Sequence, residues 1–124
     1  MKITTLNPLI VTKDSAPIIK LFEELGFERR HKIEANTGNT DFTSVRMKNE
    51  GGFYVDIAEI PGFPQQDLSL IRMNVDDFDE AYNMLLEKGF THTSGKTVDT
   101  RTNKSCMMKS PSGFAFDLCQ HIKE

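Results

Sequence analysis

The sequence has no tryptophan, only two cysteines and no long apolar run. Its apolar stretches are too short for a membrane span or for the apolar region of a signal peptide, so the sequence predicts a cytoplasmic protein that does not contact a membrane. Cys106 and Cys119 lack CxxC spacing, and in an unexported chain such cysteines are typical of reduced thiols rather than of a disulfide.

The chain also lacks a surplus of basic residues. Its formal charge is −3 and its pI is about 5.6, which argues against a nucleic-acid partner, because binding phosphates needs clustered Lys and Arg. One dense basic cluster, Arg29-Arg30-His31-Lys32, is flanked by Glu28 and Glu34, and we interpret it as a solvated strand edge. A length of 124 residues fits a single domain, residues 1–124.

The first half of the chain has the pattern of a strand, a helix and three strands. Ile3 to Val11 is β-branched and aliphatic, and Pro17 marks the first turn of a helix predicted over Ala16 to Leu25, with apolar positions at Ile18, Leu21, Phe22 and Leu25. Gly26 stands where a left-handed helix end is expected. Three strand candidates follow, at Phe27 to Ile33, Phe42 to Lys48 and Gly52 to Ile60.

The second half repeats this order. Leu68 to Val75 reads as a strand, Asp76-Asp77 caps a helix that ends at Gly89, and the apolar face of that helix comprises Phe78, Ala81, Tyr82, Leu85 and Leu86. Three further strands are predicted at Phe90 to Thr93, Ser105 to Lys109 and Phe114 to Ile122, with a surface loop over Ser94 to Lys104.

An internal repeat connects the two halves. Leu25-Gly26-Phe27 corresponds to Lys88-Gly89-Phe90, and Val55-Asp56-Ile57 corresponds to Phe116-Asp117-Leu118. We therefore predict an α+β fold of two βαβββ modules, module one at 1–60 and module two at 68–124, joined by a linker at 61–67. One helix covers one face of each four-stranded module and leaves the other face for a ligand or a partner.

Four short motifs flank the predicted helices and the last strand: Val11-Thr12-Lys13-Asp14, Leu25-Gly26-Phe27, Val75-Asp76-Asp77 and Ser110-Pro111-Ser112-Gly113-Phe114. They resemble motifs of the vicinal-oxygen-chelate superfamily, which includes glyoxalases, bleomycin-resistance proteins and extradiol dioxygenases. The resemblance implies a curved, half-open mixed sheet with a concave cup, helices on the outer face and, often, a homodimer.

Metal-dependent relatives bind a divalent ion with four side chains, from the first and last strands of each module. By the resemblance, these positions carry Asn7, Asp56, Leu70 and Asp117 here. Leucine has no lone pair to donate, and the set lacks the imidazole that suits zinc, nickel or iron. We therefore expect no cofactor. A hard ion held by Asn7, Asp56 and Asp117 stays the alternative.

Strand alternation predicts which side chains line the cup. Val55 and Ile57 pack beneath the first helix, and Ile71, Met73 and Val75 face the second helix. The expected ligand-binding residues on the opposite face are Asn7, Leu9, Tyr54, Asp56, Leu70, Arg72, Asn74 and Asp117.

Two interpretations of this cup are open. Asp56 and Asp117 could act as acid and base, or Arg72 could neutralise one or both in a structural network. The missing ligand favours a metal-free small-molecule binding protein. The alternatives are a metal-dependent lyase, isomerase or dioxygenase acting on vicinal oxygens, and an effector-sensing or partner-binding module.

Overall fold

The computed structural model describes residues 2–37, 40–60, 66–93, 98–99 and 103–121. The chain divides into two compact units. The first unit is Asn7–Leu70, and the second unit combines Met1–Leu6 with Ile71–Glu124. The two helices and the mixed strand pairing found within these residues confirm the α+β class. Among the described residues, no helix is long and apolar enough to cross a membrane.

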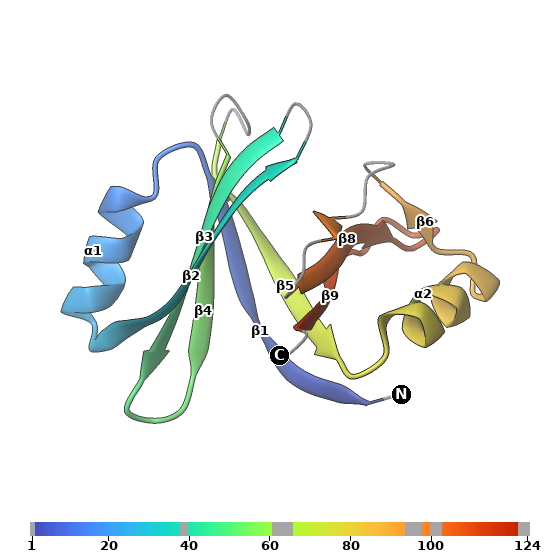
Figure 1. Cartoon of the computed structure of the whole chain (residues 1–124), viewed down its shortest axis with the longest axis horizontal. Helices are drawn as coiled ribbons and strands as arrows, with labels where there is room; N and C mark the ends of the chain where they lie inside the picture. The colour runs from blue at the N-terminus through green and yellow to red at the C-terminus, as the bar shows by residue number, and fades with distance from the viewer. Residues whose placement is uncertain (1, 38–39, 61–65, 94–97, 100–102, 122–124) are drawn as a thin grey trace. The chain divides into compact units, whose positions relative to one another are not determined.

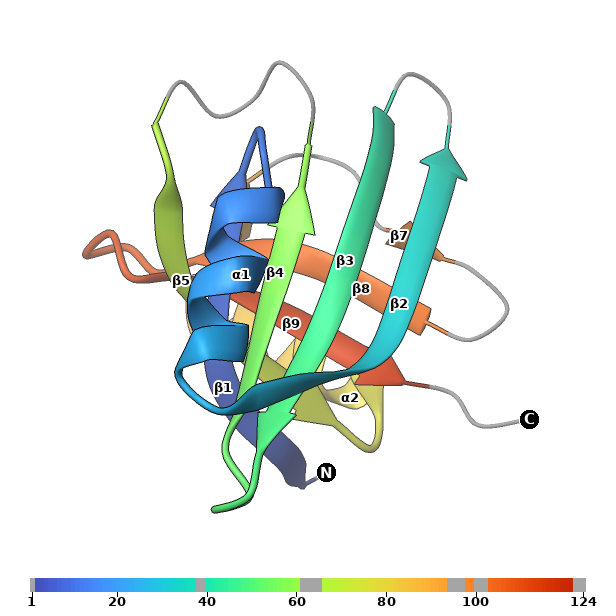
Figure 2. The same cartoon turned by 90° about the vertical axis from the view of Figure 1, so that its left-hand side faces the viewer.

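The first unit contains one helix and four strands among the described residues, and these strands lie side by side in Figures 1 and 2. Its strands are β2 (Phe27–Thr37), β3 (Thr40–Asn49), β4 (Tyr54–Glu59) and, from Asn7 onward, β1 (Ile3–Thr12), in the spatial order β2-β3-β4-β1. The β2–β3 and β3–β4 pairs are antiparallel, whereas β1 and β4 are parallel. Parallel neighbours need a crossover connection, and helix α1 lies on that connection.

Helix α1 (Ala16–Glu24) covers one face of these strands (Figure 2). Pro17 lies in its first turn, where a missing N–H needs no partner, and Gly26 follows its end with φ 97°. Its buried residue is Ile19, which packs with Val45, Met47, Val55 and Ile57 of the sheet. The predicted placement of Val55 and Ile57 beneath this helix is confirmed.

The predicted apolar face of α1 was partly wrong. Ile18 and Phe22 pack against the sheet, but Leu21 and Leu25 are 50% and 62% exposed, and Ile19 takes the central buried position. Helical spacing alone does not decide whether Leu21 and Leu25 or Ile19 lies on the buried side with Ile18 and Phe22. Contact with the sheet selects Ile19.

The second unit repeats this arrangement. Its strands are β5 (Leu68–Val75), β6 (Thr91–His92), β7 (Val98–Asp99), β8 (Asn103–Lys109) and β9 (Ala115–His121). β5 and β9 are parallel, and β8 is antiparallel to β9. β6 and β7 pair with different stretches of β8, so together they occupy the place that β2 has in the first unit.

Helix α2 (Phe78–Glu87) covers the strands of the second unit. Asp77 caps it by accepting a hydrogen bond from the backbone N–H of Glu80, as expected. The core beneath it comprises Val75, Phe78, Ala81, Leu85, Cys106, Met108, Phe116 and Leu118. Leu86 and Ile71 were expected to pack here, but they are 44% and 40% exposed.

Two connections were predicted from turn-forming residues. The loop prediction over Ser94 to Lys104 was wrong at both β7 and the start of β8, which pair with each other through Asp99 and Lys104. Short polar strands such as these lack the apolar alternation that marks a strand in a sequence. The linker predicted at 61–67 lies, except for its last two residues, outside the described part of the chain.

Candidate functional site

A buried carboxylate marks the sheet face of the first unit that lies opposite α1. Asp56, on β4, is 1% exposed, and Arg46, on β3, is 25% exposed. Arg46 donates from Nε to Asp56 Oδ1 at 2.8 Å and from Nη2 to Asp56 Oδ2 at 2.9 Å. This two-point geometry is the strongest form of an arginine–carboxylate contact, and it neutralises a charge that would be costly to bury alone.

Asn7, on β1, completes the cluster. Its side-chain nitrogen Nδ2 donates to Asp56 Oδ2 at 2.9 Å, and its side-chain oxygen Oδ1 accepts from Arg46 Nη2 at 3.2 Å. Three adjacent strands thus each contribute one polar side chain. We call Asn7, Arg46 and Asp56 the Arg46 cluster.

Arg46 is the residue that sequence reasoning missed. The signal for it was present in the hairpin, because Arg46 stands five residues before Gly51 and Asp56 stands five residues after it. A turn centred on Gly51 pairs these two positions, and the structure has this register. Alternation with Val45 and Met47, which face the helix, would then have placed Arg46 on the face of Asp56.

The aromatic ring of Tyr54 lies beside the Arg46 cluster. The guanidinium carbon of Arg46 is 4.8 Å from the ring centroid, and the ammonium of Lys48 is 5.2 Å from it. Cations at these distances are attracted by the electron-rich face of the ring. The surface next to Asp56 is therefore both basic and aromatic.

Apolar side chains continue the same face of the first unit. Leu9 pairs with Asp56 in the β1–β4 register and is 3% exposed. It forms a small cluster with Val11 and Ala58, against which Leu70 packs. Leu70 therefore serves as packing, and we call Leu9, Val11, Ala58 and Leu70 the apolar wall.

The second unit holds another ion pair. Arg72, on β5, donates from Nε to Asp117 Oδ2 of β9 at 2.6 Å, and the two side chains are 14% and 7% exposed. Asn74, two residues along β5, is also buried and donates to the Thr5 hydroxyl at 2.8 Å. The expected pairing of Arg72 with an aspartate is therefore found with Asp117.

The two aspartates of the repeat obtain their cations from different strands. Asp56 is opposite Arg46 on its antiparallel neighbour, where the corresponding partner of Asp117 is Met107. Asp117 is instead opposite Arg72 on its parallel neighbour. The repeat conserves the buried aspartate and its neutralisation but moves the arginine from the third strand of the module to the first.

Cys106 lies in the core of the second unit. Its burial, and after it the negative charge of Asp117, raises the pKa of the Cys106 thiol to about 11. Cys106 and Cys119 are buried thiols that are not joined in a disulfide, and the Cys119 thiol donates to the Asn103 side-chain oxygen at 2.9 Å. A thiol with such a pKa stays protonated near neutral pH, which does not suit a nucleophile.

The predicted metal-ligand positions do not fit a metal ion as they are arranged. Both oxygens of Asp56 already accept hydrogen bonds from a guanidinium, and Asn7 directs its amide nitrogen at the same carboxylate. A divalent ion here would stand against the positive charge of Arg46. Asp117 is engaged by Arg72, and Leu70 offers no donor atom.

These features define a class of protein: an α+β chain of two βαβββ units, each with a helix on one sheet face and a neutralised aspartate on the last strand. The model of the Glyoxalase/Bleomycin resistance protein/Dioxygenase superfamily matches residues 3–118, and the chain belongs to that superfamily. A comparison with curated proteins found no match.

Solved structures share the fold at low sequence identity. Methylmalonyl-CoA epimerase from Mycobacterium tuberculosis is 12% identical with a TM-score of 0.74, over 98% of this chain and 90% of that one. A superfamily member from Vibrio splendidus 12B01 is 21% identical with a TM-score of 0.59, over 94% and 97%. Glyoxalase I from Zea mays is 13% identical with a TM-score of 0.60, over 95% of this chain and 43% of that one. At these identities the likeness concerns the fold alone.

Proposed function

We propose that the chain is a small-molecule binding protein of the glyoxalase and bleomycin-resistance type that works without a metal ion. The proposal rests on the double contact between Arg46 and Asp56. The guanidinium of Arg46 supplies next to Asp56 the positive charge that a divalent ion would otherwise supply. Because it belongs to the chain, it does not have to be bound from solution and needs no water ligands. The apolar wall around Leu9 supports a ligand with an organic body.

Arg46 provides a recognition group for such a ligand. Two of its three guanidinium nitrogens contact Asp56 or Asn7, while Nη1 has no hydrogen-bond partner in the part of the chain that the structure describes. Asp56 holds the guanidinium in position, so an acceptor oxygen of a ligand meets a pre-oriented donor. We propose a ligand in which an aromatic or apolar body carries a carboxylate or another anionic oxygen.

Metal content tests the first part of the proposal. Purified protein is dialysed separately against Mn²⁺, Co²⁺, Ni²⁺ and Zn²⁺, desalted, and analysed by mass spectrometry of the elements. We expect far less than one ion per chain, and the same trace amount in Asp56→Asn. A stoichiometric ion that disappears in Asp56→Asn would favour the metal-dependent lyase, isomerase or dioxygenase instead.

Titration with benzoate tests the second part. We expect saturable amide shifts along β3 and β4 in nuclear magnetic resonance spectra of the labelled protein. Arg46→Lys keeps the charge but loses the planar fork, so we expect it to weaken benzoate binding by about tenfold. Lys88→Gln, a surface change in the second unit, is the matched control and should leave the affinity unchanged. Equal effects of the two variants would contradict the assignment.

We also propose that the protein is a cytoplasmic homodimer. Leu6 and Ile71 of the second unit are 60% and 40% exposed, and large exposed apolar side chains support an interface. Sedimentation at several protein concentrations tests the dimer, and Leu6→Ser should shift the equilibrium toward the monomer. A monomer at all concentrations would contradict this part. A tightly copurifying second protein would favour the partner-binding alternative.

A further inference from the structure

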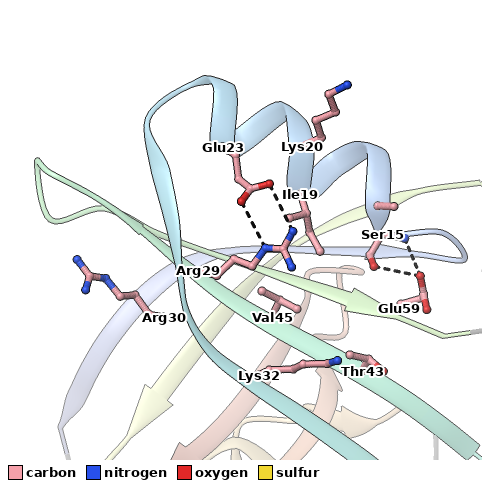
Figure 3. Close-up of a pocket in the computed structure, with 11 residues that line it drawn as sticks. Ser15, Ile19, Lys20, Glu23, Arg29, Arg30, Lys32, Thr43, Val45 and Glu59 are labelled. Atoms are coloured by element: carbon pink, nitrogen blue, oxygen red, sulfur yellow. Dashed lines mark hydrogen bonds and ion pairs between the residues drawn. The ribbon is translucent and has the colours of Figure 1, made fainter.

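The helix side of the first unit contains a groove that the proposed ligand site does not use. The groove lies between α1 and strands β2, β3 and β4, and its volume is about 740 Å³ (Figure 3). Ile19 and Val45 form its apolar part. Such a volume is within the usual range for small-molecule pockets. The Arg46 cluster lies on the opposite face of these strands, since Arg46 alternates with Val45 and Met47.

A β-bulge brings the basic residues of β2 to this groove. Arg29 pairs with Met47, whereas Lys32 pairs with Val45, because the register shifts between Arg29 and His31 and leaves Arg30 as the extra residue. Regular alternation would place Arg29 and Lys32 on opposite faces. Because of the bulge, Arg29 and Lys32 each pair with a residue that faces the helix. Bulges often re-aim side chains in this way at functional sites.

Figure 3 shows how the cations are arranged. Arg29 points into the space beneath α1, and Lys32 extends along the strands toward Thr43, whereas Lys20 and Arg30 extend outward at the rim. Four cations and two carboxylates line the groove, so the lining carries a surplus of positive charge in a protein whose formal charge is −3. Arg29, Arg30 and Lys32, from the basic cluster that we interpreted as a solvated strand edge, line this groove.

The two carboxylates are fewer than the four cations of the lining, and each makes a contact of its own. Glu59 Oε1 accepts from both the backbone N–H and the hydroxyl of Ser15, at 2.8 and 3.0 Å, which fixes it at the start of α1. Glu23 contacts Arg29 only at 3.4 Å, and the two side chains are 44% and 61% exposed. An exposed ion pair of this length is weak, and a ligand anion can displace it.

We propose that this groove is a second binding site, which accepts a small anion bearing phosphate or carboxylate groups and contacts Arg29 and Lys32. The apolar residues favour an anion with an organic portion. The site is independent of the ligand proposed for the Arg46 cluster, because the two lie on opposite faces of the sheet.

Two probes distinguish a site for phosphate groups from a site for carboxylate groups. Labelled protein is titrated separately with pyrophosphate and with phthalate, and amide shifts are mapped. We expect at least one probe to give saturable shifts at Ser15, Lys20, Lys32 and Thr43, and the tighter probe identifies phosphate or carboxylate chemistry. Shifts confined to β3 and β4 residues next to Asp56, or shifts that do not saturate, would overturn the proposal.

Variants test the two cations. Arg29→Gln combined with Lys32→Gln should weaken binding of the probe by about tenfold, as expected for the loss of two partly exposed charge contacts. Lys88→Gln combined with Lys109→Gln removes the same charge from the second unit and should change the affinity by less than about twofold. If the double variant folds poorly, the affinity of Lys32→Gln alone for the probe is measured instead, and it should also be weaker than that of the unchanged protein. Equal weakening by the control pair would mean general charge attraction and would overturn the site.

Discussion

Arg46 and Asp56 face each other across the β3–β4 pair, and the guanidinium of Arg46 contacts both carboxylate oxygens, at 2.8 and 2.9 Å. Asp56 is almost fully buried, so removing its cation leaves a charge without compensation. We expect Arg46→Ala to lower the free energy of unfolding by about 3 kcal/mol, measured by urea denaturation.

Arg29→Ala is the control for that change. Its partner Glu23 is 44% exposed and remains hydrated, so we expect a loss below about 1 kcal/mol. Exchange of both Arg46 and Asp56 for apolar residues should recover much of the stability. Similar losses in Arg46→Ala and Arg29→Ala would mean that Asp56 is hydrated in solution.

The pKa of Cys106 predicts a loss of stability at alkaline pH. Burial and the charge of Asp117 raise this pKa from 9.0 to about 11, so the native thiol stays protonated where the unfolded thiol ionises. The stabilising contribution is complete below pH 9.0 and decreases as the pH rises toward about 11. Cys106→Ala removes this linkage, and its unfolding free energy should fall less steeply across this range. Parallel curves for the two proteins would contradict the assignment.

Helix α1 offers a matched pair of apolar positions. Ile19 is 7% exposed and packs on the sheet, whereas Leu21 is 50% exposed. We expect Ile19→Ala to cost about 3 kcal/mol and Leu21→Ala less than about 1 kcal/mol, because only the first leaves a cavity. Thermal and urea unfolding measure both. A larger loss at Leu21 would restore the helix face predicted from the sequence.

The sequence predicted the order of elements because each element carries its own local signal. Strand β5 was predicted over its observed bounds, Leu68–Val75, and the glycines at 26 and 89 end their helices with positive φ. The orientation of α1 was missed, since it depends on contacts with strands that lie far away in the sequence. The Arg46 cluster was missed for a related reason: pairing of Arg46 with Asp56 requires the hairpin register, which no single strand pattern contains.

The site residues of the second unit show the same limit. Arg72 was expected to neutralise an aspartate, and the β5–β9 register places it opposite Asp117. The partner of Asn74 was not foreseen, because Thr5 precedes it by 69 positions. A single cup that joins all eight predicted residues stays a prediction.

Two neighbouring threonines test the partner of Asn74. Thr5 accepts the hydrogen bond from the buried Asn74 amide, whereas Thr4 is exposed. Thr5→Val keeps the shape of the side chain but leaves the amide unpaired, so we expect a loss of about 1 to 2 kcal/mol. Thr4→Val should have an effect close to zero. Thermal unfolding measures both, and equal effects would show that Asn74 finds another acceptor.

The second unit draws its first residues, Met1–Leu6, from the opposite end of the chain. Besides the Thr5 contact, the backbones of Lys2 and Asp76 are hydrogen-bonded to each other. The boundary of the sequence repeat therefore does not coincide with the boundary of the folded units. A chimaera joined at the linker would therefore keep Thr5 and Asn74 from the same parent only if the first six codons travel with the second half.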